Sequence, residues 1–184
     1  MAADHKGFTL WMTGLSGSGK STITEVLIDS FEARDVPIEV LDGDIVRENL
    51  SKGLGFSKED RDTNITRIGF VADLLARNGV PVVTAAISPY QETRDAVRKQ
   101  HEQSGARFIE TFIATSLEDC EARDVKGLYA KARSGEIPVF TGVSDPYEAP
   151  GSPELAVETA GKTPEESAAT ILAYLEAERL IPAA

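Results

Sequence analysis

The sequence is poor in cysteine and contains no long apolar segment. Cys120 is the single cysteine among 184 residues, so an intrachain disulfide and a metal site built from cysteines are both excluded. No apolar run approaches the roughly 20 residues that a bilayer-spanning helix requires, and the first residues lack the apolar stretch of a signal peptide. These absences predict a cytoplasmic protein that has no membrane partner.

Positive charge is also scarce. Acidic residues outnumber basic ones by 30 to 19, which gives a formal net charge of −11. Because nucleic acids are usually bound by a basic surface, we expect no nucleic-acid partner, although a few well-placed arginines would still suffice for a small anionic substrate. A chain of this length with 41% hydrophobic residues can build one sizeable core, and we predict a single domain over residues 1–184.

The most informative stretch is a glycine-rich loop that follows the apolar run 8–13. Residues 14–21 read GLSGSGKS and fit the pattern G-x-x-x-x-G-K-[ST], in which backbone N–H groups surround the phosphates of a nucleotide. In this pattern Lys20 reaches the β- and γ-phosphates, Ser21 ligates Mg²⁺, and the following helix contributes the positive end of its dipole. A chance match in a strand-to-helix turn is the alternative. The amphipathic segment 22–31 supplies the expected helix and favours nucleotide binding.

Apolar and amphipathic segments alternate along the whole chain. This alternation predicts an α/β fold of the P-loop NTPase type, with a doubly wound, mainly parallel sheet of five strands flanked by helices. Prolines and glycines are frequent from 134 to 153 and indicate an irregular stretch, which we interpret as part of a mobile lid over about 124–150. The expected strands are 8–13, 36–41, 80–87, 108–114 and 155–159, and helices are expected at 22–31, from Ser57, at 90–104, from Ser116 and from Thr163.

Polar residues at the ends of two predicted strands have two interpretations each. Asp42 and Asp44 follow the second strand, and on an extended backbone both carboxylates would point to one side, toward Mg²⁺ or a substrate hydroxyl. Because Asp-Gly is a common turn pair, a surface turn is the alternative. Ser88 follows the third strand and precedes Pro89, so it is either the N-cap of a helix or a residue near the substrate.

The role of several further residues depends on which face of a helix they occupy. Arg61, Asn64 and Arg67 share one stripe, which by default is solvated. The neighbouring apolar loop 53–56 offers the alternative of a site that holds a flat ring. His101 is expected on a solvated face without a partner. Cys120, in an acidic helical segment, is expected to pack in the interior with a raised pKa.

Beyond the glycine-rich loop, several groups of residues form a more specific pattern. They are Leu41–Asp44 with Arg47, Leu54–Ser57 with Asp60, Arg61 and Asn64, Ile87–Tyr90, Cys120–Tyr129, and Phe140–Gly142 with Pro146–Glu148. With these groups, the chain resembles the adenylylsulfate kinase family from about Lys6 to about Leu175. It departs from the family pattern at Ala86 and the residue before it, where phenylalanine is more common, and at Thr66, where a second arginine is usual.

The resemblance implies an enzyme that transfers the γ-phosphate of ATP to the 3′-hydroxyl of adenosine 5′-phosphosulfate, giving 3′-phosphoadenylylsulfate and ADP, with Mg²⁺ as the metal. Mg²⁺ is assigned to Ser21 and Asp42, and Asp44 would accept the hydroxyl proton, although the two aspartates are exchangeable. The catalytic residues would be Lys20, Asp44, Ser88 and Lys126. ATP is assigned to Gly14, Leu15, Ser16, Gly17, Ser18, Gly19, Lys20, Ser21, Thr22 and Arg123, and the acceptor to Asp42, Asp44, Arg47, Phe56, Arg61, Asn64, Ile87, Ser88, Lys126 and Phe140.

The resemblance also implies a homodimer, and a functional or covalent link to a sulfate adenylyltransferase, because residues 6–11 resemble kinase domains fused to that enzyme. Direct in-line transfer is favoured, with Ser88 binding substrate rather than carrying a phosphate, since no base is evident beside it. The alternatives are a kinase of a small metabolite such as gluconate or shikimate, a nucleotide-dependent switch, and a regulatory pseudo-kinase. The missing Asn-Lys-x-Asp motif argues against the switch, and the pseudo-kinase is disfavoured by the retained Lys20, Ser21, Asp42 and Asp44.

Overall fold

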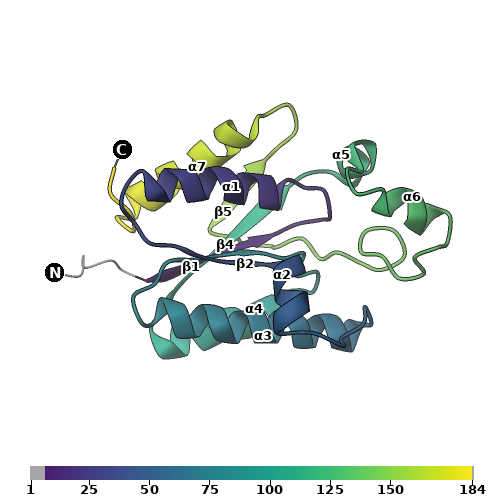
Figure 1. The fold of residues 1–184 in the computed structure, drawn as a ribbon, viewed down its shortest axis with the longest axis horizontal. Helices are drawn as coiled ribbons and strands as arrows, with labels where there is room; N and C mark the ends of the chain where they lie inside the picture. Colours follow the sequence, from purple (N-terminus) through teal and green to yellow (C-terminus); the bar gives the residue numbers. More distant parts are fainter. Residues whose placement is uncertain (1–6, 184) are drawn as a thin grey trace.

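The computed structural model describes residues 7–183 and has three layers, with one parallel sheet between two layers of helices (Figure 1). The five predicted strands are confirmed, and every neighbouring pair runs parallel. The order β2-β3-β1-β4-β5 puts the strand before the glycine-rich loop in the centre. The strands are β1 (Phe8–Thr13), β2 (Glu39–Asp42), β3 (Val82–Ala85), β4 (Arg107–Ala114) and β5 (Leu155–Glu158).

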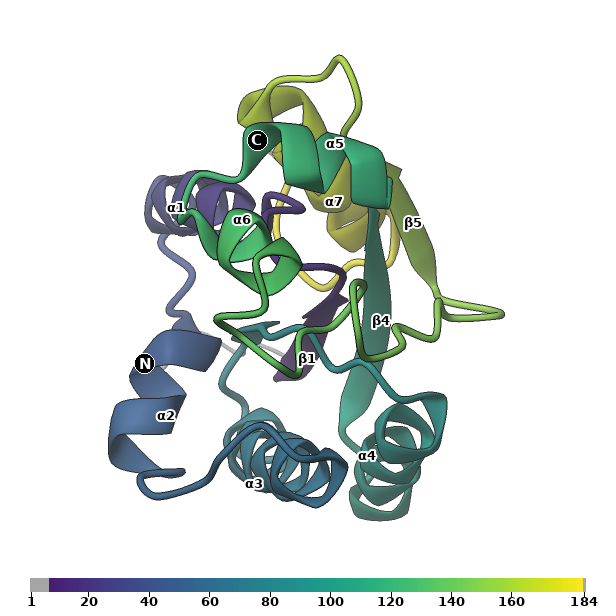
Figure 2. The same cartoon turned by 90° about the vertical axis from the view of Figure 1, so that its right-hand side faces the viewer.

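Helices cover both faces of the sheet. The longer ones are α1 (Lys20–Glu32), α3 (Lys58–Ala76), α4 (Gln91–Ser104) and α7 (Pro164–Ala177), and the short ones are α2 (Gly43–Asn49), α5 (Leu117–Arg123) and α6 (Leu128–Arg133). The pair α1 and α7 lies on one face and the pair α3 and α4 on the other, while α5 and α6 extend past the carboxyl ends of the strands (Figures 1 and 2). Within residues 7–183, no helix combines the length and apolarity needed to cross a membrane.

Side-chain caps define where several helices begin, as the sequence predicts. Ser57 accepts a hydrogen bond from the Asp60 N–H at 3.1 Å, and Ser116 caps α5 in the same way. At α7, Thr163 accepts from the Glu166 N–H at 3.2 Å while the Glu166 carboxylate accepts from the Thr163 N–H at 2.9 Å. This reciprocal pair is the predicted capping box, and it satisfies two N–H groups that the helix leaves free.

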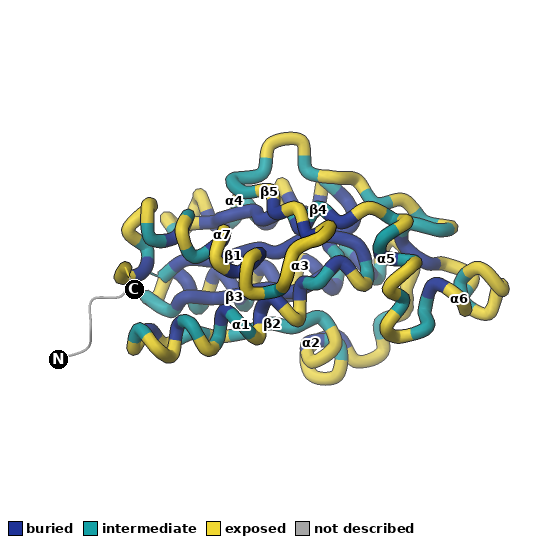
Figure 3. Tube along the Cα trace, turned by 90° about the horizontal axis from the view of Figure 1, so that it is seen from above, coloured by how far each residue is buried: buried dark blue, intermediate teal, exposed yellow. Residues whose placement is uncertain are grey.

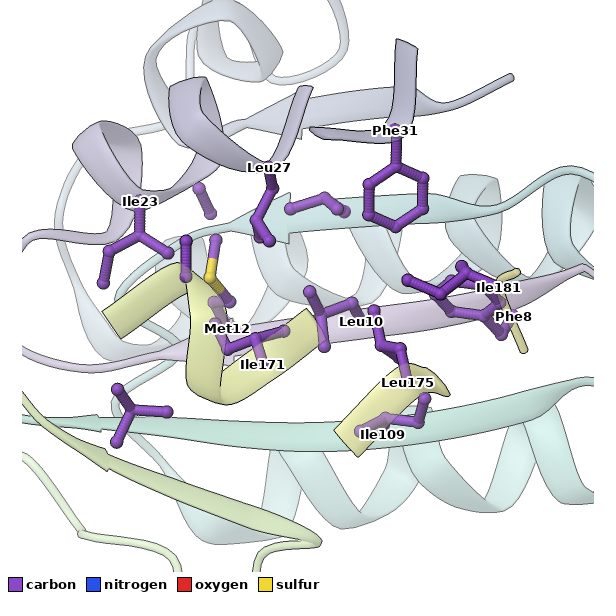
Figure 4. Packing of buried hydrophobic residues seen from close by; sticks show 14 of the residues in the cluster. Phe8, Leu10, Met12, Ile23, Leu27, Phe31, Ile109, Ile171, Leu175 and Ile181 are labelled. Atoms are coloured by element: carbon purple, nitrogen blue, oxygen red, sulfur yellow. The ribbon is translucent and has the colours of Figure 1, made fainter. Parts of the chain in front are cut away.

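Alternation along β1 divides the apolar core between the two faces of the sheet. Burial of each large apolar side chain contributes about 1.5–3 kcal/mol of stability. The central strands are buried and appear as dark blue tube in Figure 3. On the face that α3 and α4 cover, Trp11 packs with Ile65, Ile68, Val97 and Phe108. Under α1 and α7, the cluster in Figure 4 contains Phe8, Leu10 and Met12 of β1, Ile23, Leu27 and Phe31 of α1, and Ile171 and Leu175 of α7.

Helix α2 was not predicted from the sequence. It begins directly after β2, and Asp42 caps it by accepting a hydrogen bond from the Asp44 N–H at 2.9 Å. The expectation of an extended backbone here, with both carboxylates pointing to one side, is therefore wrong. The physical reason is that an aspartate side chain can hydrogen-bond the backbone two residues on, which favours a helix start over continuation of the strand.

The expected solvated position of His101 is also wrong. This side chain is fully buried, with Nε2 3.0 Å from Thr9 Oγ1 and Nδ1 2.8 Å from the Val97 carbonyl oxygen. Burial lowers the pKa of the imidazole. Val97 and His101 are one helical turn apart on the face of α4 that packs on the sheet, which is the spacing that the sequence analysis overlooked.

Candidate active site

The glycine-rich loop joins β1 to α1 and closes around the amino group of Lys20. Gly17 and Gly19 adopt φ values of 75° and 106°, a left-handed conformation that other residues disfavour. Lys20 Nζ donates to the carbonyl oxygens of Gly14 and Leu15 at 2.8 Å each, and burial lowers its pKa to about 8. The lysine predicted to meet the phosphates is therefore held by carbonyl groups of its own loop.

Ser21 and Asp42 bring two oxygen donors together beside this loop. The Ser21 hydroxyl donates to Asp42 Oδ2 at 3.1 Å, which joins the first turn of α1 to the end of β2. Mg²⁺ takes oxygen ligands, keeps several waters and needs only one or two protein groups beside the phosphates, so this pair fits a magnesium ion. Across residues 7–183, no cluster of three or more His, Cys, Asp or Glu side chains is arranged to hold a metal.

A second pair crosses from the predicted lid to α2. Lys126 Nζ lies 2.7 Å from Asp44 Oδ2, so two predicted catalytic residues are in contact although they are far apart in the sequence. The side chains are 63% and 77% exposed, and such solvated pairs contribute about 0–1 kcal/mol. The hydrogen bond to Asp44 raises the pKa of Lys126, which keeps its amino group protonated. A nucleotide can therefore separate the two groups at little cost.

Two arginines flank an exposed aromatic ring. The guanidinium carbon of Arg47 lies 4.5 Å from the centroid of the Phe56 ring, and that of Arg61 lies 5.6 Å from it. Arg61 Nε donates to the Phe56 carbonyl oxygen at 2.9 Å, and its Nη2 donates to that of Val139 at 3.3 Å. Burial and the neighbouring Arg61 lower the pKa of Arg47. Two guanidinium groups beside a flat ring suit a ligand that carries both a base and an anionic group.

Helix α3 turns two residues of the predicted stripe inward, whereas the third, Arg67, is exposed. Arg61 and Asn64 are only 7% and 6% exposed, so the solvated interpretation is wrong for both. Asn64 Oδ1 is buried and has no hydrogen-bond partner within residues 7–183. Buried polar atoms are normally paired, and one that is not is a candidate contact for a ligand.

Ser88 is not the cap of α4. The N-cap is Tyr90. Ser88 lies in the segment between β3 and α4 and adopts a φ of 48°. Its side chain is 1% exposed, and its hydroxyl has no hydrogen-bond partner in the described part of the chain. The cap interpretation is therefore wrong, whereas a place near the substrate stays a prediction, with which an unpartnered buried hydroxyl is consistent.

The predicted lid shares a small apolar cluster with Leu15 of the glycine-rich loop and with α5. Phe140 is buried and packs edge-on against Tyr129, with the ring centroids 5.0 Å apart at 78°. The Tyr129 hydroxyl donates to the Ser16 carbonyl oxygen at 2.8 Å, which ties the lid to the glycine-rich loop. Cys120 belongs to this cluster and is fully buried, as predicted. Its pKa is raised as expected, but the main cause is burial rather than its acidic neighbours.

Two further residues assigned to ATP, Arg123 and Thr22, are exposed. Arg123 at the end of α5 donates to the Thr159 carbonyl oxygen at 3.3 Å, just after β5. Thr22 lies in the first turn of α1. The Thr115 hydroxyl donates to the Ser18 carbonyl oxygen at 2.9 Å and so connects the end of β4 to the glycine-rich loop.

Sequence reasoning missed the side chains that join the segments of the site. Thr13 Oγ1 donates to the Ile87 carbonyl oxygen at 2.7 Å and lies 2.9 Å from the Tyr147 hydroxyl. Thr13 thus connects the end of β1 to the predicted acceptor residue Ile87 and to the lid. The place of Thr13 at the end of a strand could have indicated such a role. Tyr129 and Tyr147 lie in segments on which the family resemblance rests, but they were given no role there.

Comparison with known proteins adds a consistent result. Residues 6–158 match the family described as adenylylsulphate kinase. An adenylyl-sulfate kinase of Picosynechococcus is 55% identical over 94% of this chain and 95% of its own length. A probable bifunctional SAT/APS kinase of Sorangium cellulosum is 57% identical over 96% of this chain and 30% of its own length. The structure of the Mycobacterium tuberculosis APS kinase in complex with AMPPNP and APS has a TM-score of 0.90 at 45% identity, covering 94% of this chain and 99% of that one.

Proposed function

The chain belongs to the adenylylsulfate kinase family, and from this premise we propose how its residues share the reaction. The enzyme transfers the γ-phosphate of ATP to the 3′-hydroxyl of adenosine 5′-phosphosulfate, a step in the activation of sulfate. The family match also decides against the gluconate-type and shikimate-type kinases, which were the main alternative. What remains to be assigned is the role of each side chain.

The proposal rests on the position of α2, which extends from the glycine-rich loop to the two arginines beside Phe56. At its start, Asp42 contacts Ser21 of the glycine-rich loop at 3.1 Å. Two residues on, Asp44 meets Lys126, and one turn later Arg47 lies over the Phe56 ring. A donor phosphate at the loop and an acceptor nucleotide at the arginines would therefore meet beside Asp44. We assign Asp44 to orient the 3′-hydroxyl and accept its proton, because an alcohol has no useful acidity of its own.

Cationic groups stabilise the charge that develops on the transferred phosphoryl group. Lys20 and Lys126 are the two amino groups placed for this, one inside the glycine-rich loop and one on the lid. Mg²⁺ would be held by Ser21 and Asp42, and when bound it neutralises charge on the β- and γ-phosphates. The lid would exclude water, which otherwise competes with the acceptor for the phosphate.

Ser88 is assigned to substrate binding, with direct transfer between the two nucleotides. Its buried hydroxyl has no carboxylate or imidazole partner within residues 7–183 that would activate it as a nucleophile. Rapid mixing with labelled ATP and no acceptor tests this assignment. Phosphorylation of Ser88 at a rate matching turnover would contradict it.

The wider setting is proposed on the same basis. We propose that the enzyme acts in the cytoplasm as a homodimer, in functional or covalent association with a sulfate adenylyltransferase. The bifunctional relative in Sorangium cellulosum supports the association, because this chain matches 30% of that longer protein. Light scattering of the purified protein tests the dimer, and co-purification with the adenylyltransferase tests the association.

The activity itself is tested by comparing acceptors. ADP release is measured with adenosine 5′-phosphosulfate, gluconate and shikimate in parallel, and the product is identified by mass spectrometry. We expect turnover with adenosine 5′-phosphosulfate alone and a phosphate on its 3′-oxygen. Turnover with a non-nucleotide alcohol and none with adenosine 5′-phosphosulfate would refute the assignment.

A further inference from the structure

Arg94 lies on α4, outside the catalytic and binding residues assigned above, and is almost completely buried at 1% exposure. Its guanidinium group donates in several directions. Nη1 donates to the Ser88 carbonyl oxygen at 2.6 Å, and Nη2 donates to the Glu148 carbonyl oxygen at 2.6 Å and to Gln91 Oε1 at 2.7 Å. Nε donates to Glu110 Oε1 at 2.8 Å. A buried arginine is costly to desolvate, and here that cost is offset by bonds to two separate backbone segments.

The two backbone segments held by Arg94 also bind each other directly. The Glu148 N–H donates to the Pro89 carbonyl oxygen at 2.8 Å, and the Gln91 N–H donates to Glu148 Oε2 at 2.7 Å. Ser88 lies at the centre of this arrangement in a left-handed conformation that is unusual for a residue other than glycine. Arg94 therefore holds a strained turn and the end of the predicted lid together.

Further bonds continue the connection into the predicted lid. The Tyr90 hydroxyl donates to Asp145 Oδ2 at 2.8 Å, and the same carboxylate oxygen lies 3.6 Å from Arg61 Nε. The Gly142 N–H donates to the Asp145 carbonyl oxygen at 2.7 Å. The segment 140–148 is thus attached to α3 and α4, whereas Val125 in the first part of the lid is 87% exposed.

We propose that Arg94 is a positioning residue that holds the Ser88 turn and segment 140–148 as one preformed wall of the acceptor site. This proposal rests on the proposed assignment of Ser88 and Phe140 to that site. It also changes the lid: the half from 140 to 148 is fixed before substrate arrives, and closure is left to the exposed turn that carries Val125 and Lys126. Arg94 acts through the backbone of Ser88 and Glu148 and does not touch the reacting atoms.

Arg94→Lys tests the proposal, because lysine keeps the charge but cannot donate to two carbonyl groups and a carboxylate in the same directions. We expect the KM for adenosine 5′-phosphosulfate to rise about tenfold or more, with the KM for ATP changed by less than about twofold. Arg98→Lys is the matched control. Arg98 lies one turn along α4 and pairs with the same Glu110, but has no bond to Ser88 or Glu148. Its variant should keep both KM values within about twofold.

Hydrogen exchange of the protein without substrates gives a readout that does not depend on the reaction. Arg94→Lys should accelerate exchange of the Glu148 and Gln91 amides, which bridge the two segments, and leave the amides of β1 and β4 unchanged. Unchanged exchange at Glu148 and Gln91, or an equal rise of both KM values, would overturn the proposal. Accelerated exchange with no change in the acceptor KM would instead refute the assignment of Ser88 to the acceptor site and leave the structural tie in place.

Tyr90→Phe serves if Arg94→Lys does not fold, because it removes a single hydroxyl from the same connection. The Tyr90 hydroxyl bonds Asp145, so its loss should accelerate exchange at the Gly142 amide and raise the acceptor KM about threefold. Normal values of both quantities in this variant would count against a preformed wall.

Discussion

The half of the site proposed for ATP, the donor half, and the half proposed for adenosine 5′-phosphosulfate, the acceptor half, are held by different kinds of contact. The Lys20 amino group donates to Gly14, Leu15 and Ser18, which all lie within six residues of it in one loop. On the acceptor side, Arg61 donates to the Phe56 carbonyl oxygen five residues away and to that of Val139, 78 residues away. The amino group of Lys20 is therefore held by local contacts, whereas the guanidinium group of Arg61 is held partly by a distant segment. The two halves should respond separately to mutation, except at the residues where they meet.

Asp44 is one meeting point, and Asp44→Asn should have the largest effect. We expect turnover to fall about a hundredfold or more, because the acceptor loses its general base, while the affinity for ATP stays nearly the same. Stopped-flow measurement of phosphoryl transfer, with the dissociation constant of a non-hydrolysable ATP analogue, separates the two quantities.

The control for this variant is Glu48→Gln on the same short helix. Glu48 is exposed and lies one turn beyond Asp44, so its loss removes the same charge from α2 without touching the proposed reaction centre. A similar loss of turnover in both variants, or nearly normal turnover in Asp44→Asn, would remove Asp44 from the role of base.

Phe56→Ala should affect the acceptor half alone. Stacking of one base on an aromatic ring contributes about 1–3 kcal/mol, so we expect the KM for adenosine 5′-phosphosulfate to rise about tenfold and the KM for ATP to stay unchanged. Phe70→Ala is a matched control, because Phe70 is 56% exposed on α3 and Phe56 is 57% exposed. Equal effects of the two variants, or a parallel rise in the KM for ATP, would show that the halves are not separate.

The same difference explains what could be predicted from the sequence. The strand, loop and helix around Lys20 and Ser21 could be predicted, since the motif and the contacts of the Lys20 amino group lie within a few residues. The five strands and the capping box at Thr163 followed from local patterns in the same way. The contacts of the glycine-rich loop with Asp42, Thr115 and Tyr129 come from distant segments and could not be predicted. Where structure depends on neighbouring residues alone, the sequence is sufficient.

The acceptor half could be recognised by family resemblance, but local sequence patterns could not predict its arrangement. Whether Arg61 faced solvent or the interior depended on Val139 and Asp145, which the chain brings back from a distant segment. For Ser88, the sequence could not decide between a helix cap and a residue near the substrate. Its left-handed turn is held by Arg94 through a contact that no local pattern indicates. His101 was misplaced for a related reason: its partner, Thr9, lies on a strand 92 residues earlier.

On the donor half, the pKa of Lys20 predicts how nucleotide affinity varies with pH. Burial lowers this pKa to about 8, whereas a bound triphosphate favours the protonated amine. Below pH 8 the free protein already carries the proton, so the affinity should be flat. Above pH 8 binding must take up a proton, and the affinity for a non-hydrolysable ATP analogue should fall by up to about tenfold for each pH unit. Calorimetry in buffers of different ionisation enthalpy measures both the affinity and the proton uptake.

Lys20→Met is the control for the pH series, because methionine fills similar space and does not titrate. It should bind the analogue more weakly and show no change in affinity between about pH 7.5 and pH 9.5. If the variant keeps the dependence of the wild-type protein, another group is responsible. The affinity for adenosine 5′-phosphosulfate should not change over this pH range in either protein, which is a second test that the halves are separate.

Tyr129 also contacts both halves, and removal of its hydroxyl alone should change the KM of one substrate only. Its hydroxyl bonds the Ser16 carbonyl oxygen on the donor loop, while its ring packs against Phe140 of the acceptor wall. Tyr129→Phe removes the hydroxyl and keeps the ring, so we expect the KM for ATP to rise about threefold, as for one lost hydrogen bond, with the acceptor KM unchanged. Tyr129→Ala removes both and should raise both KM values. If Tyr129→Phe instead raised both KM values, the two halves would be coupled through the backbone of the glycine-rich loop. Mutations in one half would then also affect substrate binding in the other.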